Sequence, residues 1–569
     1  MLSNLFQHSS TSTSSSIDYL QRVGSCHSFN IMETNDLNTS TNISVSKKHS
    51  IEFYWTIKIK ANYTFIYSLS NTKTIDLRTN SYQTIEILNS RSRTLSASYA
   101  IYQVTTFDEL WFNYDKLCNE AGKTLAKALN TNFTLKNLNL RSKRLCNVSG
   151  KAVAETLCNN ITITSLNIDD NNLTDEAGKA MAEALHKNTT LKDLNLNNNL
   201  LSDETGKAIA EALCDNGGIA LAKVLYENTF LTNLDLNNNK LGESAGKALA
   251  EALCKNTTLT NLNLGYNMLG ESTGKALAEA LSKNTTLTNL NIRINKFGES
   301  AGKALAEVLS KNTTLTNLFL GVNGSTVKAL AEALCKNTTL TNLNLYLNKM
   351  GESTGKALAE ALCKNTMLTN LDLSYKEMDE LVEKALAEVL CKNNTLTDLK
   401  LYHYGFDKSQ STGKALGEAL CKNTTLTNLT LCDLNHNKLG ELAAKTLAEA
   451  LCKNNTLTNL DLSSNGLGES AGKALAESLC INNTLTDLNL SNNQLGESAG
   501  KALAEALCKN HTLTDLNLSH NELLGESAGK ALAEALCINT TLTDLKLYCN
   551  KMVNQQEKHW QKLYAKILP

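Results

Sequence analysis

The chain has 569 residues and a formal net charge of -1, and only 5% of its residues are aromatic. A nearly neutral chain has no global field that would favour nucleic acid or an anionic membrane, so we expect neither as a partner. No apolar run approaches the roughly 18 residues that a membrane span needs, and the start lacks the basic-then-apolar order of a secretory signal. The sequence therefore predicts a cytoplasmic protein.

Residues 1–106 form an N-terminal segment that is rich in Ser, Thr and Asn. A low-complexity run of Ser and Thr near its start predicts partial disorder. Residues 51–67 alternate between apolar and polar side chains, which indicates a possible β-hairpin. Residues 107–134 carry apolar residues at helical spacing, and we expect them to form a helical N-terminal cap.

Residues 135–552 repeat one unit about fifteen times. The first part of a unit, such as Leu262-Asn263-Leu264, alternates with period 2 and is typical of a short strand with one buried face. The second part, such as residues 275–281, places Leu at i and i+4 beside Ala and is typical of a helix. The expected unit starts are Leu135, Ile163, Leu191, Leu231, Leu259, Leu287, Leu315, Leu340, Leu368, Leu396, Leu429, Leu457, Leu485, Leu513 and Leu542.

An Asn, such as Asn267, follows the strand in most units, and its amide can pair with backbone groups that the turn leaves open. We expect these amides to form a ladder along the stack. Strands stack about 4.8 Å apart and helices about 8–10 Å apart, so a stack of such units must bend toward its strands. The sequence predicts an α/β solenoid, a horseshoe with parallel strands on the concave face and helices on the convex face. Residues 553–569 have helical spacing and are expected to cap its C-terminal end.

The run Asn-Thr-Thr-Leu-Thr-Asn-Leu-Asn-Leu followed by Gly-Lys-Ala-Leu-Ala-Glu-Ala-Leu resembles the ribonuclease-inhibitor class of leucine-rich repeats. The likeness is closest to the repeat region of NOD-like receptors and covers roughly residues 113–552. It implies a horseshoe that engages a protein partner on its concave face. Ran GTPase-activating proteins use the same repeat class, so regulation of a small GTPase is the alternative function that the resemblance implies.

Several sequence features resemble ligand-binding or redox sites, but their spacing indicates a structural role. Residues 242–248 resemble a phosphate-binding loop, but three rather than four residues separate the glycines, and Ala follows the lysine. Successive helices stand about 8–10 Å apart, too far for disulfides between them. The cysteines at one repeat position are therefore expected to be reduced, buried packing groups. We predict no enzymatic activity, no cofactor and no metal. These cysteines are Cys158, Cys214, Cys254, Cys335, Cys363, Cys391, Cys421, Cys452, Cys480, Cys508 and Cys537.

The clearest functional signal is variation at the two residues before the turn Asn, which are expected to face the concave wall. Aromatic residues gather there in the middle units, and aromatic residues and Arg anchor many protein interfaces. The alternatives that stay open are drift on a solvated surface and an array without one dedicated ligand. The predicted partner-binding residues are Tyr266, Arg293, Phe319, Tyr346, Tyr375, Tyr402, His403 and His436.

Overall fold

The computed structural model describes residues 120–214, 230–322, 324–347, 351–375, 380–403, 410–433, 440–521 and 524–550, together with four strands nearer the N-terminus. The chain divides into two compact units, Met1–Glu52 and Phe53–Pro569. All elements below belong to the second unit. The predicted boundaries at residues 106, 134 and 552 stay predictions, and residues 553–569 lie outside the described residues.

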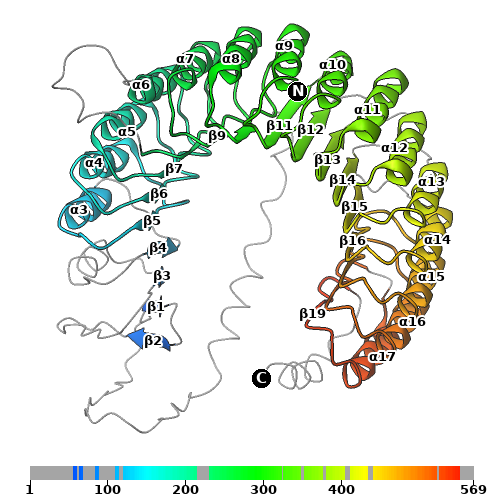
Figure 1. Ribbon diagram of the computed structural model, residues 1–569. Helices are drawn as coiled ribbons and strands as arrows, with labels where there is room; N and C mark the ends of the chain where they lie inside the picture. The colour runs from blue at the N-terminus through cyan, green and yellow to red at the C-terminus, as the bar shows by residue number, and fades with distance from the viewer. Residues whose placement is uncertain are drawn as a thin grey trace, which may run out of the picture. The chain divides into compact units, whose positions relative to one another are not determined.

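A single sheet runs through the second unit (Figure 1). Strands β1 (Trp55–Ile59) and β2 (Tyr63–Tyr67) pair antiparallel, and β1 also pairs antiparallel with β3 (Thr84–Leu88). From β3 through β4 (Glu109–Asn113) to β19, each strand pairs in parallel with the next along the chain. The other strands are β5 (Asn137–Asn139), β6 (Ser165–Asn167), β7 (Asp193–Asn195), β8 (Asn233–Asp235), β9 (Asn261–Asn263), β10 (Asn289–Asn291), β11 (Asn317–Val322), β12 (Asn342–Leu347), β13 (Asn370–Tyr375), β14 (Asp398–His403), β15 (Asn428–Asp433), β16 (Asn459–Asp461), β17 (Asp487–Asn489), β18 (Asp515–Asn517) and β19 (Asp544–Lys546).

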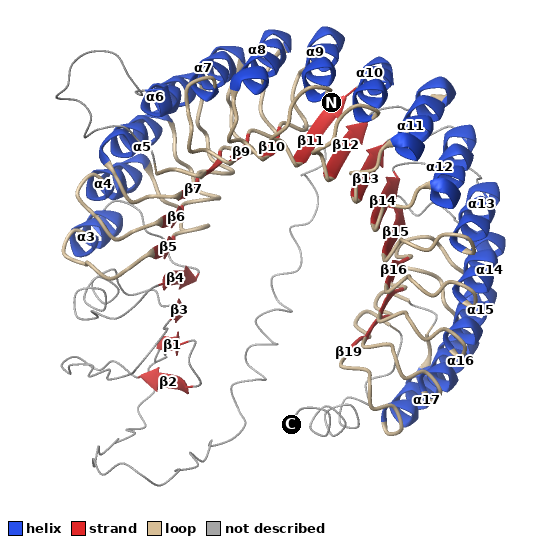
Figure 2. Ribbon diagram, viewed as in Figure 1, coloured by secondary structure: helices blue, strands red, loops and turns tan. Residues whose placement is uncertain are grey.

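A helix follows each strand from β4 to β18, so that helices form one layer and strands the other (Figure 2). Among the described residues no helix is both long and apolar enough to cross a bilayer, since the longest have 13 residues. The helices are α3 (Glu120–Leu129), α4 (Asn147–Leu157), α5 (Asp175–Lys187), α6 (Asp203–Cys214), α7 (Glu243–Leu253), α8 (Glu271–Lys283), α9 (Glu299–Leu309), α10 (Gly324–Leu334), α11 (Glu352–Lys364), α12 (Glu380–Lys392), α13 (Gln410–Leu420), α14 (Gly440–Leu451), α15 (Glu469–Leu479), α16 (Glu497–Leu507) and α17 (Glu526–Leu536).

One continuous core of Leu and Ala lies between the two layers. Leu262 and Leu264 of one unit are buried from the strand side, and Leu277 and Leu281 of its helix are buried from the other. Each such Leu contributes roughly 1.5–3 kcal/mol when it leaves water. The fold predicted from the two periods, an α/β solenoid with parallel strands, is confirmed.

The glycine inside most of the described helices has a packing role. A Cβ added at Gly274 would lie 2.5 Å from the Cβ of Ala301 on the next helix, and one at Gly246 would lie 2.4 Å from Thr273. Successive helices therefore approach each other more closely than a larger residue would allow. This close approach accounts for Gly246, the second glycine of the motif that resembles a phosphate-binding loop in the sequence.

The predicted ladder of turn asparagines is confirmed. The side-chain amide of Asn267 donates to the Leu264 carbonyl at 3.1 Å in its own unit and to the Leu236 carbonyl at 3.0 Å in the preceding one. Its oxygen accepts from the backbone N–H of Leu241 at 3.1 Å. Asn323, Asn348 and Asn437 lie outside the described residues. The described members are Asn171, Asn199, Asn239, Asn267, Asn295, Asn465, Asn493, Asn521 and Asn550.

A second asparagine ladder runs where each helix ends. The amide of Asn284 donates to the Leu253 carbonyl at 2.8 Å and the Asn256 carbonyl at 3.0 Å, both in the preceding unit. Its oxygen accepts from the backbone N–H of Leu287 at 2.7 Å. The sequence places these residues in helix-exit turns but does not reveal that they join neighbouring units. Because Asn284 is buried, its amide is closed to glycosylation.

The structure corrects two boundaries. Part of the expected helical cap, residues 109–113, is strand β4, in which Leu110 pairs with Leu138 of the next strand. Its alternating side chains extend the sheet, and only α3 in this region is helical. The unit expected to start at Leu429 starts at Leu426, because Leu429 pairs with Leu399 at the middle of the strand motif. The extra residues of this unit follow its strand.

The expected burial of the cysteine column is wrong. Of its ten members with a described side chain, six are exposed and four are half-buried. The column follows the last buried Leu of each helix, as Cys158 follows Leu157. A rotation of about 100° per residue carries that position away from the core. Partial burial still raises the pKa of the Cys158 thiol, so it favours the protonated, unreactive form.

Candidate functional site

Three positions of each strand segment project away from the core. In β9 the middle residue Leu262 is buried and the flanking residues are partly exposed. We call the positions equivalent to Asn261 the first column, those equivalent to Asn263 the second column, and those equivalent to Gly265 the third column. The first column runs from Asn137 to Asp544, the second from Asn139 to Lys546, and the third from Arg141 to Tyr548. Together they form the strand face.

Amides link the first column between β7 and β12. Asn261 donates its side-chain N–H to the side-chain oxygen of Asn233, and Asn289 donates in the same way to Asn261. Asn317 and Asn342 continue the series toward β12, and Asn233 donates to the carboxylate of Asp193 at its other end. Each amide supplies both a donor and an acceptor, so this part of the column satisfies itself.

A groove of about 560 Å³ lies on the strand face over β6 to β10, and Phe319 of β11 also lines it. Asp235 lies in this groove and accepts hydrogen bonds from the backbone N–H of Asn237 at 2.8 Å and the amide of Asn263 at 3.0 Å. Burial raises the pKa of the Asp235 carboxyl above its usual range. The side-chain amides in the groove can donate and accept hydrogen bonds as a peptide backbone does, so the groove is suited to binding a polypeptide.

Two predicted site residues contact each other beside this groove. The Arg293 guanidinium lies over the Tyr266 ring, 5.2 Å from its centroid. A cation held over an aromatic face is stabilised by the ring quadrupole. Tyr266 is 39% exposed, whereas the Arg293 Nε is buried and has no hydrogen-bond partner among the described residues. The pair therefore keeps part of the ring surface for a ligand.

Phe319 occupies the second column, where it pairs with Asn291 and Asn344 of the adjacent strands. It interrupts the polar column with an aromatic ring and lines one end of the groove. Of the predicted residues, Phe319 lines this groove, and Tyr266 and Arg293 follow its lining residues Asn263 and Asn291 along the chain.

The other predicted residues are placed only in part. Tyr346 and Tyr402 both pair with Ser374, so their backbones share the third column. Tyr375 and His403 pair with each other one position further along the strands. They therefore do not belong to the column of Tyr346 and Tyr402. His436 lies outside the described residues.

The C-terminal units carry a group that reading along the sequence missed. Asp487, Asp515 and Asp544 are successive members of the first column on β17, β18 and β19. Nearby, the ring of Tyr548 meets His520 edge-on with centroids 5.2 Å apart. These aspartates are 28 and 29 residues apart in the chain, so only alignment of the columns brings them together.

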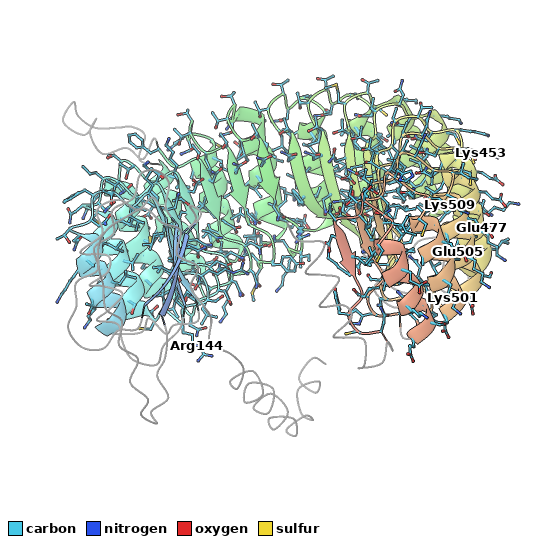
Figure 3. All side chains as sticks on the ribbon, turned by 90° about the horizontal axis from the view of Figure 1, so that it is seen from below. Arg144, Lys453, Glu477, Lys501, Glu505 and Lys509 are labelled. Atoms are coloured by element: carbon cyan, nitrogen blue, oxygen red, sulfur yellow. The ribbon has the colours of Figure 1, made fainter. Side chains whose placement is uncertain are left out.

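The helix layer has a different charge pattern. Its Glu and Lys residues pair four residues apart within one helix, as in Lys275–Glu271 at 3.2 Å and Lys303–Glu299 at 2.6 Å. Figure 3 shows residues of this type, including Lys501 and Glu505, on the helices of the C-terminal units. Such exposed pairs add little stability, but they leave the helix layer locally neutral.

Two family models match parts of the chain. The model described as TMOD/LMOD Leucine-rich domain matches residues 218–323. The model described as Leucine Rich repeat matches residues 159–182, 187–210, 453–476, 482–504 and 509–533. No curated protein matches the sequence.

Solved structures give weaker matches. Leiomodin-1 actin-binding site 2 is 21% identical over 29% of this chain and 89% of that chain, with a TM-score of 0.24. The complex of Rad7 and Elc1 in yeast gives 18% identity over 62% and 90%, with a TM-score of 0.39. The TLR13–ssRNA13 complex gives 18% identity over 79% and 61%, with a TM-score of 0.46. At these scores the structures carry no information about the partners of this chain.

The class of the chain follows from its own strands and from the family models. Strands β5 to β19 form one open parallel sheet, each strand places the same Leu residues in the core, and helices alternate with them. The two family models describe leucine-rich repeats in the same part of the chain. The chain is a leucine-rich-repeat solenoid of the α/β type.

Proposed function

We propose that the chain is a cytoplasmic protein-binding scaffold that engages a partner through its strand face, at the groove beside Tyr266, Arg293 and Phe319. The observation that carries the proposal is the contact of Arg293 with the exposed ring of Tyr266, near a groove lined by amides. Aromatic and Arg residues supply much of the energy of protein interfaces, and amides match a polypeptide backbone. Proteins built from this repeat generally act as non-enzymatic binding scaffolds.

We further propose that the repeats belong to the ribonuclease-inhibitor-like subclass and that the chain has a receptor-like role. Tyr346, Tyr375, Tyr402, His403 and His436 extend the proposed contact region toward the middle units. Among the described residues, no specific contact favours the small-GTPase alternative.

The proposal predicts that replacing the groove residues abolishes capture of a partner. The test variant is Tyr266→Asn/Arg293→Asn/Phe319→Asn, which introduces the residue that nearby units carry at the same positions, as Asn238, Asn237 and Asn291 do. The full chain is immobilised in a lysate of the cells that produce it, and retained proteins are quantified by mass spectrometry. We expect at least one protein to fall by about tenfold, as loss of interface anchors implies.

The control variant is Ile481→Lys/Ile538→Lys, which changes exposed apolar residues at the helix exits to the Lys found in equivalent units. It should retain the partner. Retention of the same proteins by the groove variant and by the wild type would refute the groove. A parallel variant, Tyr346→Ser/Tyr375→Ser/Tyr402→Ser, tests whether contact extends to the middle units.

A further inference from the structure

The first column changes its hydrogen-bonding chemistry along the array. From β8 to β12 every member is Asn, and each amide donates to the preceding unit. From β17 to β19 the members are Asp487, Asp515 and Asp544. Ionised carboxylates only accept hydrogen bonds, so the chain of alternating donors and acceptors cannot continue through them.

These three carboxylates receive few donors from the protein. Asp487 accepts from the hydroxyl of Thr486 at 2.7 Å, and Asp515 accepts from the hydroxyl of Thr514 at 2.8 Å. Asp544 pairs with Lys546 at 2.9 Å. A carboxylate can accept about four hydrogen bonds, so most of this capacity faces solvent. Like charges directly across adjacent strands also repel.

The surroundings do not neutralise the column. Across β16 to β19 the three columns of the strand face hold four carboxylates, Asp461 and the three above, and one cation, Lys546, for a net charge of -3. Asp461 accepts from the amide of Asn489 at 3.0 Å and from the backbone N–H of Ser463 at 2.8 Å, and neither donor carries a charge. At the edge of this surface Tyr548 is 58% exposed.

We infer that the strand face of β16 to β19 docks a cationic polypeptide segment. Its Lys or Arg side chains supply the donors that the Asp487–Asp515–Asp544 column lacks, and the positive charge that its carboxylates require. The exposed Tyr548 ring offers a face for one of these cations. This surface is separated along the sheet from the groove over β6 to β10, so it stands as a second interface even if the groove binds nothing.

The array itself provides the matched substitution for a test. Asn occupies the first column in most other units. The variant Asp487→Asn/Asp515→Asn/Asp544→Asn therefore removes three negative charges and adds amide donors, using a residue that this position already carries elsewhere in the array. The control, Glu469→Gln/Glu497→Gln/Glu526→Gln, removes three negative charges from α15, α16 and α17 in the same units. Circular dichroism checks that both variants retain the fold.

The probe is a fluorescent 12-residue peptide of alternating Arg and Ser, titrated into the full-length chain and followed by fluorescence anisotropy. A peptide of alternating Glu and Ser is the charge-reversed probe. We expect the wild type to bind the Arg peptide and not the Glu peptide. The triple Asn variant should weaken binding by about tenfold, and the helix-layer control by less than about twofold, because only the strand-face carboxylates contact the peptide.

Three outcomes overturn the inference. The first is equal binding of the Arg and Glu peptides, and the second is an equal loss in both variants, which would reflect overall charge alone. The third concerns the chain's own basic residues, Lys558, Lys562 and Lys566. If Lys558→Gln/Lys562→Gln/Lys566→Gln raises peptide affinity by about tenfold, the surface is occupied by the C-terminal segment of the same chain rather than by an external partner.

Discussion

The units around β6 to β10 and those around β11 to β15 end their strands in different ways. Strands in the first group have three residues, and a residue with positive φ follows two positions after a buried Leu, such as Asn238 at 50°. Strands in the second group have six residues, and the same position continues to pair, as Leu347 does with Tyr375. The repeat motif therefore has two ways to satisfy the backbone beyond its core leucines.

The residues at this position account for part of the difference. Three of the five short-strand units carry Asn or Asp there, as at Asp170 and Asn198, and these residues tolerate left-handed backbone conformations. The other two units carry Tyr266 and Ile294 in the same conformation. At the same position the six-residue group includes Val322 and Tyr375, residue types that favour strands. The described members of the turn ladder all belong to units with short strands. Within the described residues, a polar turn with its amide and a longer strand are two ways in which units pair the backbone beyond their core leucines.

The largest expected effect comes from removing one amide of the short-strand group. Asn267→Ala leaves the Leu236 and Leu264 carbonyls and the Leu241 N–H without their partner inside the protein. We expect the free energy of unfolding to fall by about 3 kcal/mol, since each unsatisfied buried group costs about 1 kcal/mol or more. Urea unfolding followed by circular dichroism measures the change.

The exposed turn residue Lys296 provides the control, because its side chain makes no hydrogen bond to the ladder among the described contacts. Lys296→Ala should leave stability within about 0.5 kcal/mol of the wild type. An equally small effect of Asn267→Ala would show that water replaces the amide and that the ladder is not needed for the short-strand form.

An intermediate effect, of opposite sign, is expected at Ile294. This β-branched residue has a φ of 52° at the turn position where nearby units carry Asn198 and Asn238. Left-handed backbone costs a β-branched residue roughly 1–2 kcal/mol, and Asn adopts it more readily. Ile294→Asn should therefore raise the free energy of unfolding by about 1 kcal/mol in the same urea assay. A loss of stability would mean that apolar contacts of Ile294 outweigh the strain.

The smallest effect concerns pH and Asp235 in the groove of the short-strand group. Burial raises its pKa in the folded chain, so the folded state binds more protons than the unfolded state above the ordinary pKa. The contribution of Asp235 to stability therefore falls as pH rises through this interval. Asp235→Asn should exceed the wild type by a few tenths of a kcal/mol above about pH 6 and lose that advantage below about pH 3. Parallel pH profiles would contradict the assignment.

Local sequence patterns predicted the fold because the same strand, turn and helix pattern recurs in each unit. Leu262 and Leu264 show the strand, Leu277 and Leu281 show the helix, and Asn267 shows the turn, all within 28 residues. Such signals need no knowledge of distant contacts. The same reading overestimated the burial of Cys158, because the side that a helix exposes in its last turn depends on how it packs.

The candidate site was less accessible to sequence reasoning. Tyr266, Arg293 and Phe319 stand out as departures from the repeat, but their relation to one groove depends on pairing between strands. The carboxylate column from Asp487 to Asp544 is invisible along the chain and appears only when units are aligned by register. The added length of β11 to β15 likewise depends on pairing with neighbouring strands.

Where they are described, both asparagine ladders link a unit to the one before it through bonds that depend on position in the unit, not on distance along the chain. Asn239 still reaches the Leu196 carbonyl at 3.0 Å although 43 residues, rather than the usual 31, separate them. The joint between units thus tolerates extra chain at a helix exit. Whole units can be duplicated, lost or lengthened with the joints unchanged. Gene duplication can therefore change the length of a polar column on the strand face, and the order of residues within it, one unit at a time.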